Sequence, residues 1–371
     1  MSEKFDVDFS LALHNRTGKY FIGRDLILGA PEYLNHTYYG WLKSKQPISG
    51  LPAKVLGRLQ YLHTYHHALG GPLARWAPRQ SKRALLHLDP FTVLNTQLRP
   101  QDAVLCHDVG PLTHPDLFDD AVCQIYQYIY QHLATVNCHM IFVSEASRHA
   151  YAQVQPQAKP LSQRVIYPAI RCDVASSSTV AAPPKVSKPY LLTVGSVGAR
   201  KNQLLCINAF AQSKLAEQGV SYVICGGPEP GFEQVAQAAA HTPGVVLLDY
   251  VTDAELSDLY DHAAGFVLAS QLEGFGIPVA EAISKGLIPI VTQDSVLYEV
   301  AGPGALLVDA NRCQSIAEAM VQLITMTPGE REARLAQLQE AITRFTPEQF
   351  IQDWKAALAE MLEINRSLSK E

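Results

Sequence analysis

The chain has 371 residues, more than one hydrophobic core usually serves, so two domains are expected. Its apolar fraction of 47% and charged fraction of 18% are typical of a soluble globular protein, and no apolar run approaches the roughly 20 residues that a membrane span needs. The first residues do not form a signal peptide, and the seven cysteines contain no C-x-x-C pair. These features exclude a disulfide framework and a zinc site, and they favour reduced thiols in a cytoplasm.

The net charge of −5 is unevenly distributed. Residues 1–83 carry twelve Lys and Arg against five Asp and Glu, a net of +7, whereas residues 84–175 give −3 and residues 176–371 give −9. A basic first segment in an acidic protein suggests an anionic partner on that side. A basic face that contacts only solvent, without a partner, explains the same charge distribution.

The chain opens with an expected strand over Phe5 to Leu13, a polar loop over 14–19 and a helix from Tyr20 to Leu28. Strand, glycine loop and helix form the start of a Rossmann-like unit, although Gly18 alone is a weak signal. Asp6-Val7-Asp8 imitates a metal-binding D-x-D, but these residues alternate along the strand, so we expect no metal there.

Residues 51–83 are predicted to be helical and amphipathic, with apolar residues at three- and four-residue steps: Val55, Leu59, Leu62, His66 and Leu69. Basic residues accompany them, with an aromatic one among them: Arg58, Arg75, Trp76, Arg79, Lys82 and Arg83. Such a stretch lies on an anionic membrane surface or, more often, faces a core. The histidines at 63, 66 and 67 have helical spacing but no carboxylate or cysteine beside them, which argues against a metal site.

The middle of the chain alternates short strands with helices. A strand over 102–106 ends in the run His107-Asp108-Val109-Gly110-Pro111-Leu112-Thr113-His114-Pro115, and a tyrosine-rich helix over 121–137 follows. A buried strand over 140–143 precedes Ser144, the expected N-cap of the next helix, and Val165 to Ile170 form another short strand. Residues 175–189, rich in Ser, Ala and Pro, are the predicted linker.

The second half has the strand–helix alternation of a doubly wound sheet. The strand Tyr190–Val194 leads into Gly195-Ser196-Val197-Gly198-Ala199-Arg200-Lys201-Asn202, and a helix begins at Gln203. Strands over 221–225 and 245–248 follow, the second leading into a run from Asp249 and Tyr250 to Tyr260.

The most informative stretch runs from the strand at 263–268, through Gly274-Phe275-Gly276, into a helix and a second strand at 288–291. Glu273 lies where the first strand gives way to the loop, and Glu281 lies in the opening turns of the helix. Ligands of an open parallel sheet bind beyond the carboxyl ends of its strands. Backbone N–H groups at the helix start receive phosphate oxygens there, and a carboxylate suits sugar hydroxyls.

The run E-G-F-G-I-P-V-A-E, followed by A-I-S-K-G-L-I-P-I-V-T, resembles the donor-binding signature of the family 4 retaining glycosyltransferases. The segments at 107–115, 144–148, 195–202 and 249–260 resemble further motifs of that family. Three positions depart from it: Ala169 and Asp249 replace usual glycines, and Ser196 replaces a common arginine. The serine at 196 leaves phosphate binding more dependent on Arg200 and Lys201, and the aspartate at 249 changes a loop that lies beside the nucleotide base in that family.

The resemblance implies the GT-B fold, an α/β architecture of two Rossmann-like domains whose parallel sheets face an interdomain cleft. The expected parts are an acceptor-binding domain over 1–175, a linker over 176–189, a nucleotide-sugar-binding domain over 190–346, and a helix over 347–371 that crosses back to the first domain.

The resemblance also assigns roles to single residues. Glu281 would hold the ribose hydroxyls and Glu273 those of the transferred hexose, while His107 would orient the sugar. Arg200 and Lys201 would stabilise the departing diphosphate, together with N–H groups near Gly274, Phe275, Gly276 and Ile277. The remaining candidates would contact the donor, either in the interdomain cleft or beside the nucleotide base: Arg16, Gly18, Gly195 and Tyr250.

The resemblance thus implies a metal-independent retaining glycosyltransferase without a cofactor, acting on a sugar or lipid-linked saccharide acceptor. GDP-mannose is the favoured donor because the variants at 107–115 and 195–202 are similar to those of bacterial surface-polysaccharide mannosyltransferases; UDP-glucose and dTDP-rhamnose remain open. An anionic membrane surface is a possible partner, and no nucleic acid is expected. A nucleotide-sugar epimerase or hydrolase of the same fold, and a non-catalytic sugar-nucleotide sensor, are the alternatives.

Overall fold

The computed structural model describes residues 4–10, 18–40, 42–45, 55–59, 62–63, 65–66, 81–171, 186–249 and 251–368. The chain forms two compact units, unit 1 over Met1–Ala169 with Pro347–Glu371 and unit 2 over Ile170–Thr346. The sequence assigned residues up to 175 to the first domain, whereas the contacts of Ile170 and Arg171 place them in unit 2.

In its described part, unit 1 holds one seven-stranded sheet of order β3-β2-β1-β4-β5-β6-β7, parallel except for the β2–β3 pair. Its strands are β1 (Phe5–Asp8), β2 (Leu34–Tyr39), β3 (Leu42–Ser44), β4 (Leu85–His87), β5 (Ala103–Cys106), β6 (His139–Phe142) and β7 (Gln163–Val165).

The helical segments of unit 1 are α1 (Gly18–Gly29), η2 (Pro90–Asn95), α3 (Gly110–Thr113), η3 (Pro115–Leu117), α4 (Asp120–Val136), α5 (Glu145–Val154) and α13 (Pro347–Leu368). The helix α4 buries Ile125, Ile129 and Leu133 against β5 and β6. Ser144 caps α5, as the sequence predicted, because its side chain accepts a hydrogen bond from the Ser147 N–H.

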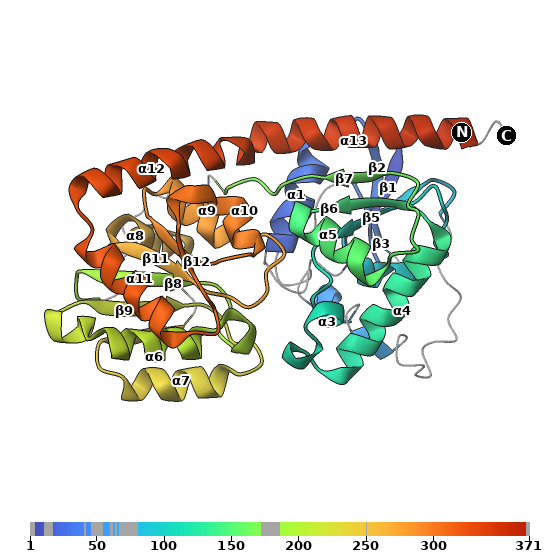
Figure 1. Ribbon diagram of the computed structural model, residues 1–371. Helices are drawn as coiled ribbons and strands as arrows, with labels where there is room; N and C mark the ends of the chain where they lie inside the picture. Colours follow the sequence, from blue (N-terminus) through green and yellow to red (C-terminus); the bar gives the residue numbers. More distant parts are fainter. Residues whose placement is uncertain are drawn as a thin grey trace. The chain divides into compact units, whose positions relative to one another are not determined.

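The last helix of the chain, α13, drawn in red in Figure 1, belongs to unit 1. It packs against α1, where Ile351 fills the space beside Gly29. Near its end, Asn365 accepts a hydrogen bond from His139 Nε2 at 3.1 Å and donates one to the Gln101 carbonyl at 3.0 Å. The C-terminal segment therefore completes the fold of unit 1.

Three expected boundaries in unit 1 were wrong. The strand β1 ends at Asp8 because the Asp8 carboxylate accepts hydrogen bonds from both the N–H and the hydroxyl of Ser10, which turns the chain. The helix α1 begins at Gly18, two residues earlier than expected. The strand β7 ends at Val165, since Ile166 is the last residue with a backbone hydrogen bond to β6.

The described residues of the segment at 51–83 do not form a uniformly core-facing helix, since Tyr65 packs against the hydrophobic core whereas other apolar side chains are exposed. Residues 55–59 are helical, but Val55, Leu59 and Leu62 are 54%, 59% and 44% exposed, and Lys82 and Arg83 lie outside any helix. The apolar side chains of Val55, Leu59 and Leu62 therefore face solvent. Among the residues described, no helix has the length and apolarity to cross a bilayer.

In its described part, unit 2 holds one six-stranded sheet, entirely parallel, of order β10-β9-β8-β11-β12-β13. Its strands are β8 (Tyr190–Val194), β9 (Ser221–Cys225), β10 (Val245–Leu248), β11 (Gly265–Leu268), β12 (Pro289–Thr292) and β13 (Leu306–Val308). The predicted bounds of β8, β9 and β10 agree with these. Central strands buried on both faces explain their continuous apolar sequences.

Helices cover both faces of this sheet, with α6, α7 and α11 on one side and α9, α10 and α12 on the other (Figure 1). The helical segments are η4 (Ala199–Lys201), α6 (Gln203–Ser213), η5 (Leu215–Gln218), α7 (Phe232–His241), α8 (Asp253–His262), α9 (Ile277–Ser284), α10 (Val296–Ala301), η6 (Gly302–Gly304), α11 (Cys313–Thr325), α12 (Pro328–Ile342) and η7 (Thr343–Phe345).

The two ends of unit 2 meet. The Ile170 N–H donates a hydrogen bond to the Phe345 carbonyl at 2.9 Å. The Phe345 ring packs edge-on against Phe275, with ring centroids 5.0 Å apart. The first and last segments of unit 2 thus adjoin the loop that precedes α9.

Candidate active site

The sheet of unit 2 reverses its strand order between β8 and β11. In open parallel sheets, ligands bind in the crevice at the carboxyl ends of the two strands where the order reverses. The segment after β8 carries Arg200 and Lys201, and the segment after β11 carries Glu273. The fold therefore brings the predicted diphosphate-binding cations and the predicted hexose-binding carboxylate to one place.

Lys201 and Glu273 form a buried ion pair across the crevice. The Lys201 ammonium contacts Glu273 Oε1, and their side chains are only 8% and 9% exposed. The Ser270 hydroxyl donates a hydrogen bond to the same oxygen at 2.9 Å. Burial raises the pKa of Glu273, but the charges of Lys201 and Arg200 outweigh it and hold that pKa below its ordinary value. Lys201 is therefore no ordinary surface lysine.

Asn202 fixes the position of this lysine. It adopts a left-handed backbone conformation between η4 and α6, which residues of its type tolerate well. Its side-chain amide donates hydrogen bonds to the carbonyls of Ala269, at 3.0 Å, and Ala310, at 2.8 Å. The Arg200 carbonyl also accepts the N–H of Gln271 at 3.0 Å. The cation-bearing segment is thus tied to the segment after β11.

Arg200 lies between two carboxylates. Its Nη2 contacts Glu229 Oε2 at 3.1 Å, and its Nη1 lies 3.6 Å from Glu273 Oε2. The Ser196 hydroxyl donates to the same Glu229 oxygen at 2.6 Å. Two cations and two carboxylates therefore give this cluster no net charge.

Glu281 projects from α9 and is almost fully buried, with 6% of its side chain exposed. The Arg171 guanidinium contacts Oε1 at 2.8 Å, and the Tyr260 hydroxyl donates to Oε2 at 3.2 Å. Burial and the nearby Glu281 carboxylate raise the pKa of Tyr260 well above its ordinary value, so this hydroxyl stays a donor. Both oxygens of the predicted ribose-binding group are thus fixed in orientation.

The backbone conformation before α9 requires glycine. Gly276 has a φ of 98°, and a Cβ at this position would lie 2.5 Å from Leu297 Cδ2. The turn starts α9 at Ile277, followed by Pro278, which has no N–H, and the Val279 N–H donates to the Gly276 carbonyl at 2.9 Å. The N–H group that the first turn of the helix can offer to a ligand is therefore that of Ile277. The predicted phosphate-binding segment Gly274–Ile277 therefore has the backbone geometry of an anion site.

The sheet of unit 1 reverses its order between β1 and β4 and carries a similar pair. Lys19, in the first turn of α1, contacts Asp89 Oδ2 at 2.9 Å, and Asp89 follows β4. Burial raises the pKa of Asp89, but Lys19 and His107 lower it, so that its pKa lies below the ordinary value. Each unit thus has a lysine–carboxylate pair at its switch point.

His107 follows β5 in unit 1 and is 6% exposed. Its Nε2 donates a hydrogen bond to the Leu88 carbonyl at 2.9 Å, so Nδ1 carries the lone pair of the neutral ring. Burial, reinforced by the charge of Lys19, lowers the pKa of His107 to about 4. The ring is therefore neutral near pH 7.

The predicted site residues fall into two groups. Unit 2 holds Arg200, Lys201, Glu273 and Glu281, with Gly195 and the residues from Gly274 to Ile277, whereas Gly18 and His107 belong to unit 1. Arg16 and Tyr250 lie outside the described residues.

Sequence reasoning missed four charged residues of these sites: Lys19, Asp89, Arg171 and Glu229. Glu229 follows Gly226-Gly227-Pro228 directly after β9, a glycine turn at a strand end that is typical of ligand sites. This signal was available. The other three follow from no motif.

The D-x-D pair in β1 makes structural hydrogen bonds. Asp6 accepts hydrogen bonds from the Asn35 amide and the Ser81 hydroxyl, both at 2.8 Å, while Asp8 binds Ser10. Among the described residues, no three His, Cys, Asp or Glu side chains come together as a possible metal site.

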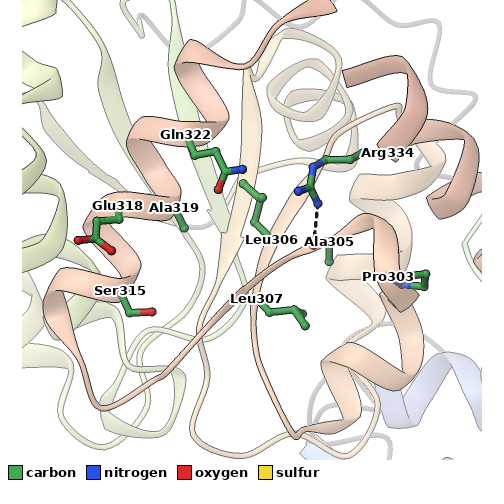
Figure 2. A pocket seen from close by; sticks show the side chains of 9 residues that line it. All are labelled: Pro303, Ala305, Leu306, Leu307, Ser315, Glu318, Ala319, Gln322 and Arg334. Carbon is green, nitrogen blue, oxygen red and sulfur yellow. Dashed lines mark hydrogen bonds between the residues drawn. The ribbon is translucent and has the colours of Figure 1, made fainter. Parts of the chain in front are cut away.

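A separate hollow of about 420 Å³ lies at the far edge of unit 2, beside β13, α11 and α12 (Figure 2). The side chains of Ser315, Glu318, Gln322 and Arg334 surround it. Arg334 Nη1 donates to the carbonyls of Gly304 and Ala305, at 3.3 and 3.2 Å. Since β13 is the edge strand, this hollow is distinct from the crevice between β8 and β11.

Comparison with known proteins agrees with this geometry. Residues 179–341 match the family model described as glycosyl transferases group 1. The matched segment contains Arg200, Lys201, Glu229, Glu273 and Glu281.

Two relatives are mannosyltransferases by name. The O-antigen chain mannosyltransferase B of Escherichia coli is 26% identical over 319 residues, which are 82% of this chain and 80% of that protein. The O-antigen chain mannosyltransferase RfbU of Salmonella typhimurium is 27% identical over 250 residues, 65% of this chain and 63% of that protein. The match thus spans less than two thirds of RfbU.

Among solved structures, an α,α-trehalose-phosphate synthase (UDP-forming) from Burkholderia vietnamiensis has a similar fold. Its TM-score is 0.60 at 12% sequence identity, and the alignment covers 95% of this chain and 86% of that one. The expected GT-B fold, with two mainly parallel α/β sheets, is confirmed. The chain therefore carries a glycosyl transferases group 1 domain and is a glycosyltransferase of the GT-B fold.

Proposed function

We propose that this protein is a retaining hexosyltransferase that moves mannose from GDP-mannose to a hydroxyl group of a saccharide acceptor. The observation that carries the proposal is the cluster of Lys201, Glu273 and Arg200 at the switch point of unit 2. It offers cations for a diphosphate beside a carboxylate for sugar hydroxyls. The two relatives named mannosyltransferases support mannose as the transferred sugar.

The donor would lie across the carboxyl ends of β8 and β11. Glu281 accepts hydrogen bonds from the ribose hydroxyls, and Glu273 accepts them from the hexose, since an ionised carboxylate is only an acceptor. The diphosphate would bind at the N-terminus of α9, beside the Ile277 N–H, where the helix dipole favours negative charge.

Transfer breaks the bond between the anomeric carbon and the diphosphate oxygen. The acceptor hydroxyl attacks that carbon on the leaving-group face, and its proton passes to an oxygen of the β-phosphate. Arg200 and Lys201 stabilise the negative charge that develops on the departing diphosphate. We propose that these two cations serve in place of a divalent metal.

His107 would act as a neutral group. Its depressed pKa excludes a role as a protonated acid near pH 7. With Nε2 held by the Leu88 carbonyl, Nδ1 offers a lone pair to a sugar hydroxyl. We infer that it orients the sugar and takes no part as a nucleophile.

A lipid-linked oligosaccharide is the favoured acceptor, with the protein bound peripherally to an anionic membrane. The net charge of +7 over residues 1–83 supports this assignment. The exposed side chains of Val55, Leu59 and Leu62 also support it, because apolar groups beside basic ones are typical of helices that lie on membranes.

Thermal shifts with GDP, UDP and dTDP test the donor first, because a ligand that binds only the folded state raises its melting temperature. GDP is expected to give the largest shift. Transfer of mannose from GDP-mannose to an added acceptor, with the anomeric configuration kept, would then establish the activity. Release of free sugar or of its 2-epimer without acceptor would instead indicate a hydrolase or an epimerase, and binding without turnover a sensor.

A further inference from the structure

Glu229 is a third carboxylate at the crevice of unit 2, and the roles proposed so far do not use it. It follows β9, the strand next to β8, and 16% of its side chain is exposed. Its Oε2 accepts two hydrogen bonds, from Ser196 at 2.6 Å and from Arg200 at 3.1 Å. Its Oε1 is buried and accepts no hydrogen bond in the described part of the chain.

The loop that carries Glu229 is built to hold it in place. The Val197 N–H donates to the Gly227 carbonyl at 2.8 Å, and the Glu229 N–H donates back to the Val197 carbonyl at 2.9 Å. A Cβ on Gly198 would lie 2.4 Å from Glu229 Cγ, so only glycine at 198 admits this side chain. The loops after β8 and β9 therefore position the carboxylate together.

A buried carboxylate oxygen without a partner is unfavourable, and the great majority of such groups in proteins are hydrogen-bonded. An ionised carboxylate has only acceptor sites, so its missing partner must supply an O–H or N–H group. The diphosphate that Arg200 and Lys201 would bind has no such group to give. Among the ligand groups proposed for this site, the hydroxyls of the donor sugar can supply one.

We propose that Glu229 Oε1 accepts a hydrogen bond from a hydroxyl group of the transferred hexose, and that Glu229 is thus a specificity-determining residue for the donor sugar. Arg200 positions the Glu229 carboxylate beside that of Glu273. Its two terminal nitrogens contact one carboxylate each, so the two carboxylates flank one guanidinium. Because Glu273 is assigned to hexose hydroxyls, its neighbour across Arg200 faces the same sugar. The inference rests on the proposed function.

Ser196 contributes to this arrangement. It occupies the position after Gly195, and its hydroxyl holds Glu229 Oε2. Ser196 and Arg200 both bind Oε2, so neither of them engages Oε1, while Arg200 balances the charge of the carboxylate.

The test compares Glu229→Gln with wild type by calorimetry, using GDP, UDP and GDP-mannose as probes. The amide keeps the shape of the side chain but can turn an N–H₂ donor toward the sugar. We expect affinity for GDP to stay the same or rise, since a negative charge near the diphosphate is removed, and affinity for GDP-mannose to fall about tenfold. Glu233→Gln, which removes an exposed carboxylate from the adjacent helix α7, is the matched control and should change neither.

GDP-mannose analogues with one hexose hydroxyl replaced by fluorine identify the contact, because fluorine cannot donate a hydrogen bond. For one analogue, wild-type affinity should fall to the level of Glu229→Gln, and the variant should lose nothing further. Equal affinities of the two proteins for every sugar donor, with a lower melting temperature of the variant, would overturn the proposal in favour of a structural role. A loss that falls on GDP but not on UDP would also overturn it, since Oε1 would then face the base. If wild type binds none of the probes, the proposed function itself fails.

Discussion

Lys201 and Glu273 form an ion pair with each other, although the sequence assigned them to different parts of one ligand, the diphosphate and the hexose. The ammonium of Lys201 contacts the carboxylate of Glu273, and both side chains are buried. The carboxylate is thereby held ionised, because the charges of Lys201 and Arg200 outweigh its burial and lower its pKa. Binding a diphosphate would exchange part of this pairing for contacts with phosphate, while Glu273 turns to sugar hydroxyls.

Replacing Glu273 by Gln should therefore have different effects on the binding of the diphosphate and on the reaction of the hexose. Lys201 and Arg200 lose a competing carboxylate, so affinity for the free nucleoside diphosphate should stay the same or increase. Turnover with the full sugar donor should fall about tenfold or more, the effect of losing a hydrogen bond to a charged group. Calorimetry with GDP and initial rates with GDP-mannose measure the two effects. An equal loss in both would mean that Glu273 shapes the whole pocket.

Glu281→Ala should weaken binding of the nucleoside diphosphate by roughly 1.5–3 kcal/mol, since the ribose loses a charged acceptor. The change also leaves Arg171 without its buried carboxylate partner, so the melting temperature should fall as well. Glu318→Ala, an exposed glutamate on α11, is the control. Unchanged affinity for GDP by calorimetry would remove Glu281 from the ribose.

Arg171 is expected to act through Glu281, as a positioning residue. Arg171→Met should reduce the preference for GDP over 2′,3′-dideoxy-GDP several-fold, because the carboxylate then loses the guanidinium that orients Oε1, while the Tyr260 hydrogen bond to Oε2 remains. Arg171→Lys should retain part of the preference. A variant that is less stable but discriminates against the dideoxy nucleotide as well as wild type would limit Arg171 to a structural role.

The pKa of His107 predicts a dependence of stability on pH. The folded protein keeps this ring neutral down to about pH 4, whereas the unfolded chain protonates it near pH 6.5. Between these values the unfolded state binds more protons, so the free energy of unfolding decreases as pH falls. The difference of about 2.5 pKa units corresponds to a loss on the order of 3 kcal/mol.

Urea unfolding of wild type and of His107→Gln between pH 7 and pH 4.5 measures this contribution. The variant lacks the titrating ring, so its stability should fall less over that range. Other histidines, such as His139, whose pKa burial also lowers, affect both proteins alike. Parallel curves for the two proteins would show that His107 is not the group responsible.

Binding to anionic liposomes should depend on the basic first segment. Each Lys or Arg near an anionic surface contributes about 1 kcal/mol, and salt screens the attraction. Changing Arg79, Lys82 and Arg83 together to Gln should weaken co-sedimentation, while activity on a short soluble acceptor survives. The same change at Lys188, Lys214 and Arg312, three exposed residues of unit 2, serves as the control. No sedimentation of wild type at low salt would exclude the membrane as a partner.

Much of unit 2 could be predicted from the sequence. Its strands are short, apolar and bounded by glycine or polar turns, so the limits of β8, β9 and β10 followed from pattern alone. The candidate site residues Arg200, Lys201, Glu273 and Glu281 stand in local motifs, and the structure brings the first three into contact.

What the sequence could not provide was the pairing between distant residues. Arg171 and Glu281 are 110 positions apart, and no local periodicity links them. The early end of β1 had a local cause that pattern reasoning overlooked, since a single aspartate side chain captured the backbone of Ser10. The segment around Val55, Leu59 and Leu62 has helical periodicity, but periodicity alone does not show whether the apolar face of the helix contacts the protein core or solvent.

The hydrogen bond between Ile170 and Phe345 makes unit 2 an insertion with closed ends within the sequence of unit 1. Domains whose termini lie close together are tolerant of excision and circular permutation. Residues 170–346 should accordingly be expressible as an autonomous nucleotide-binding fragment, because the strand order, the ion pairs and the Phe275–Phe345 contact are all internal to it. Unit 1, by contrast, depends on its final 25 residues. Its strands β1 to β7 precede unit 2 in the sequence, whereas its helix α13 follows unit 2, so unit 1 is complete only after the whole chain has been synthesised.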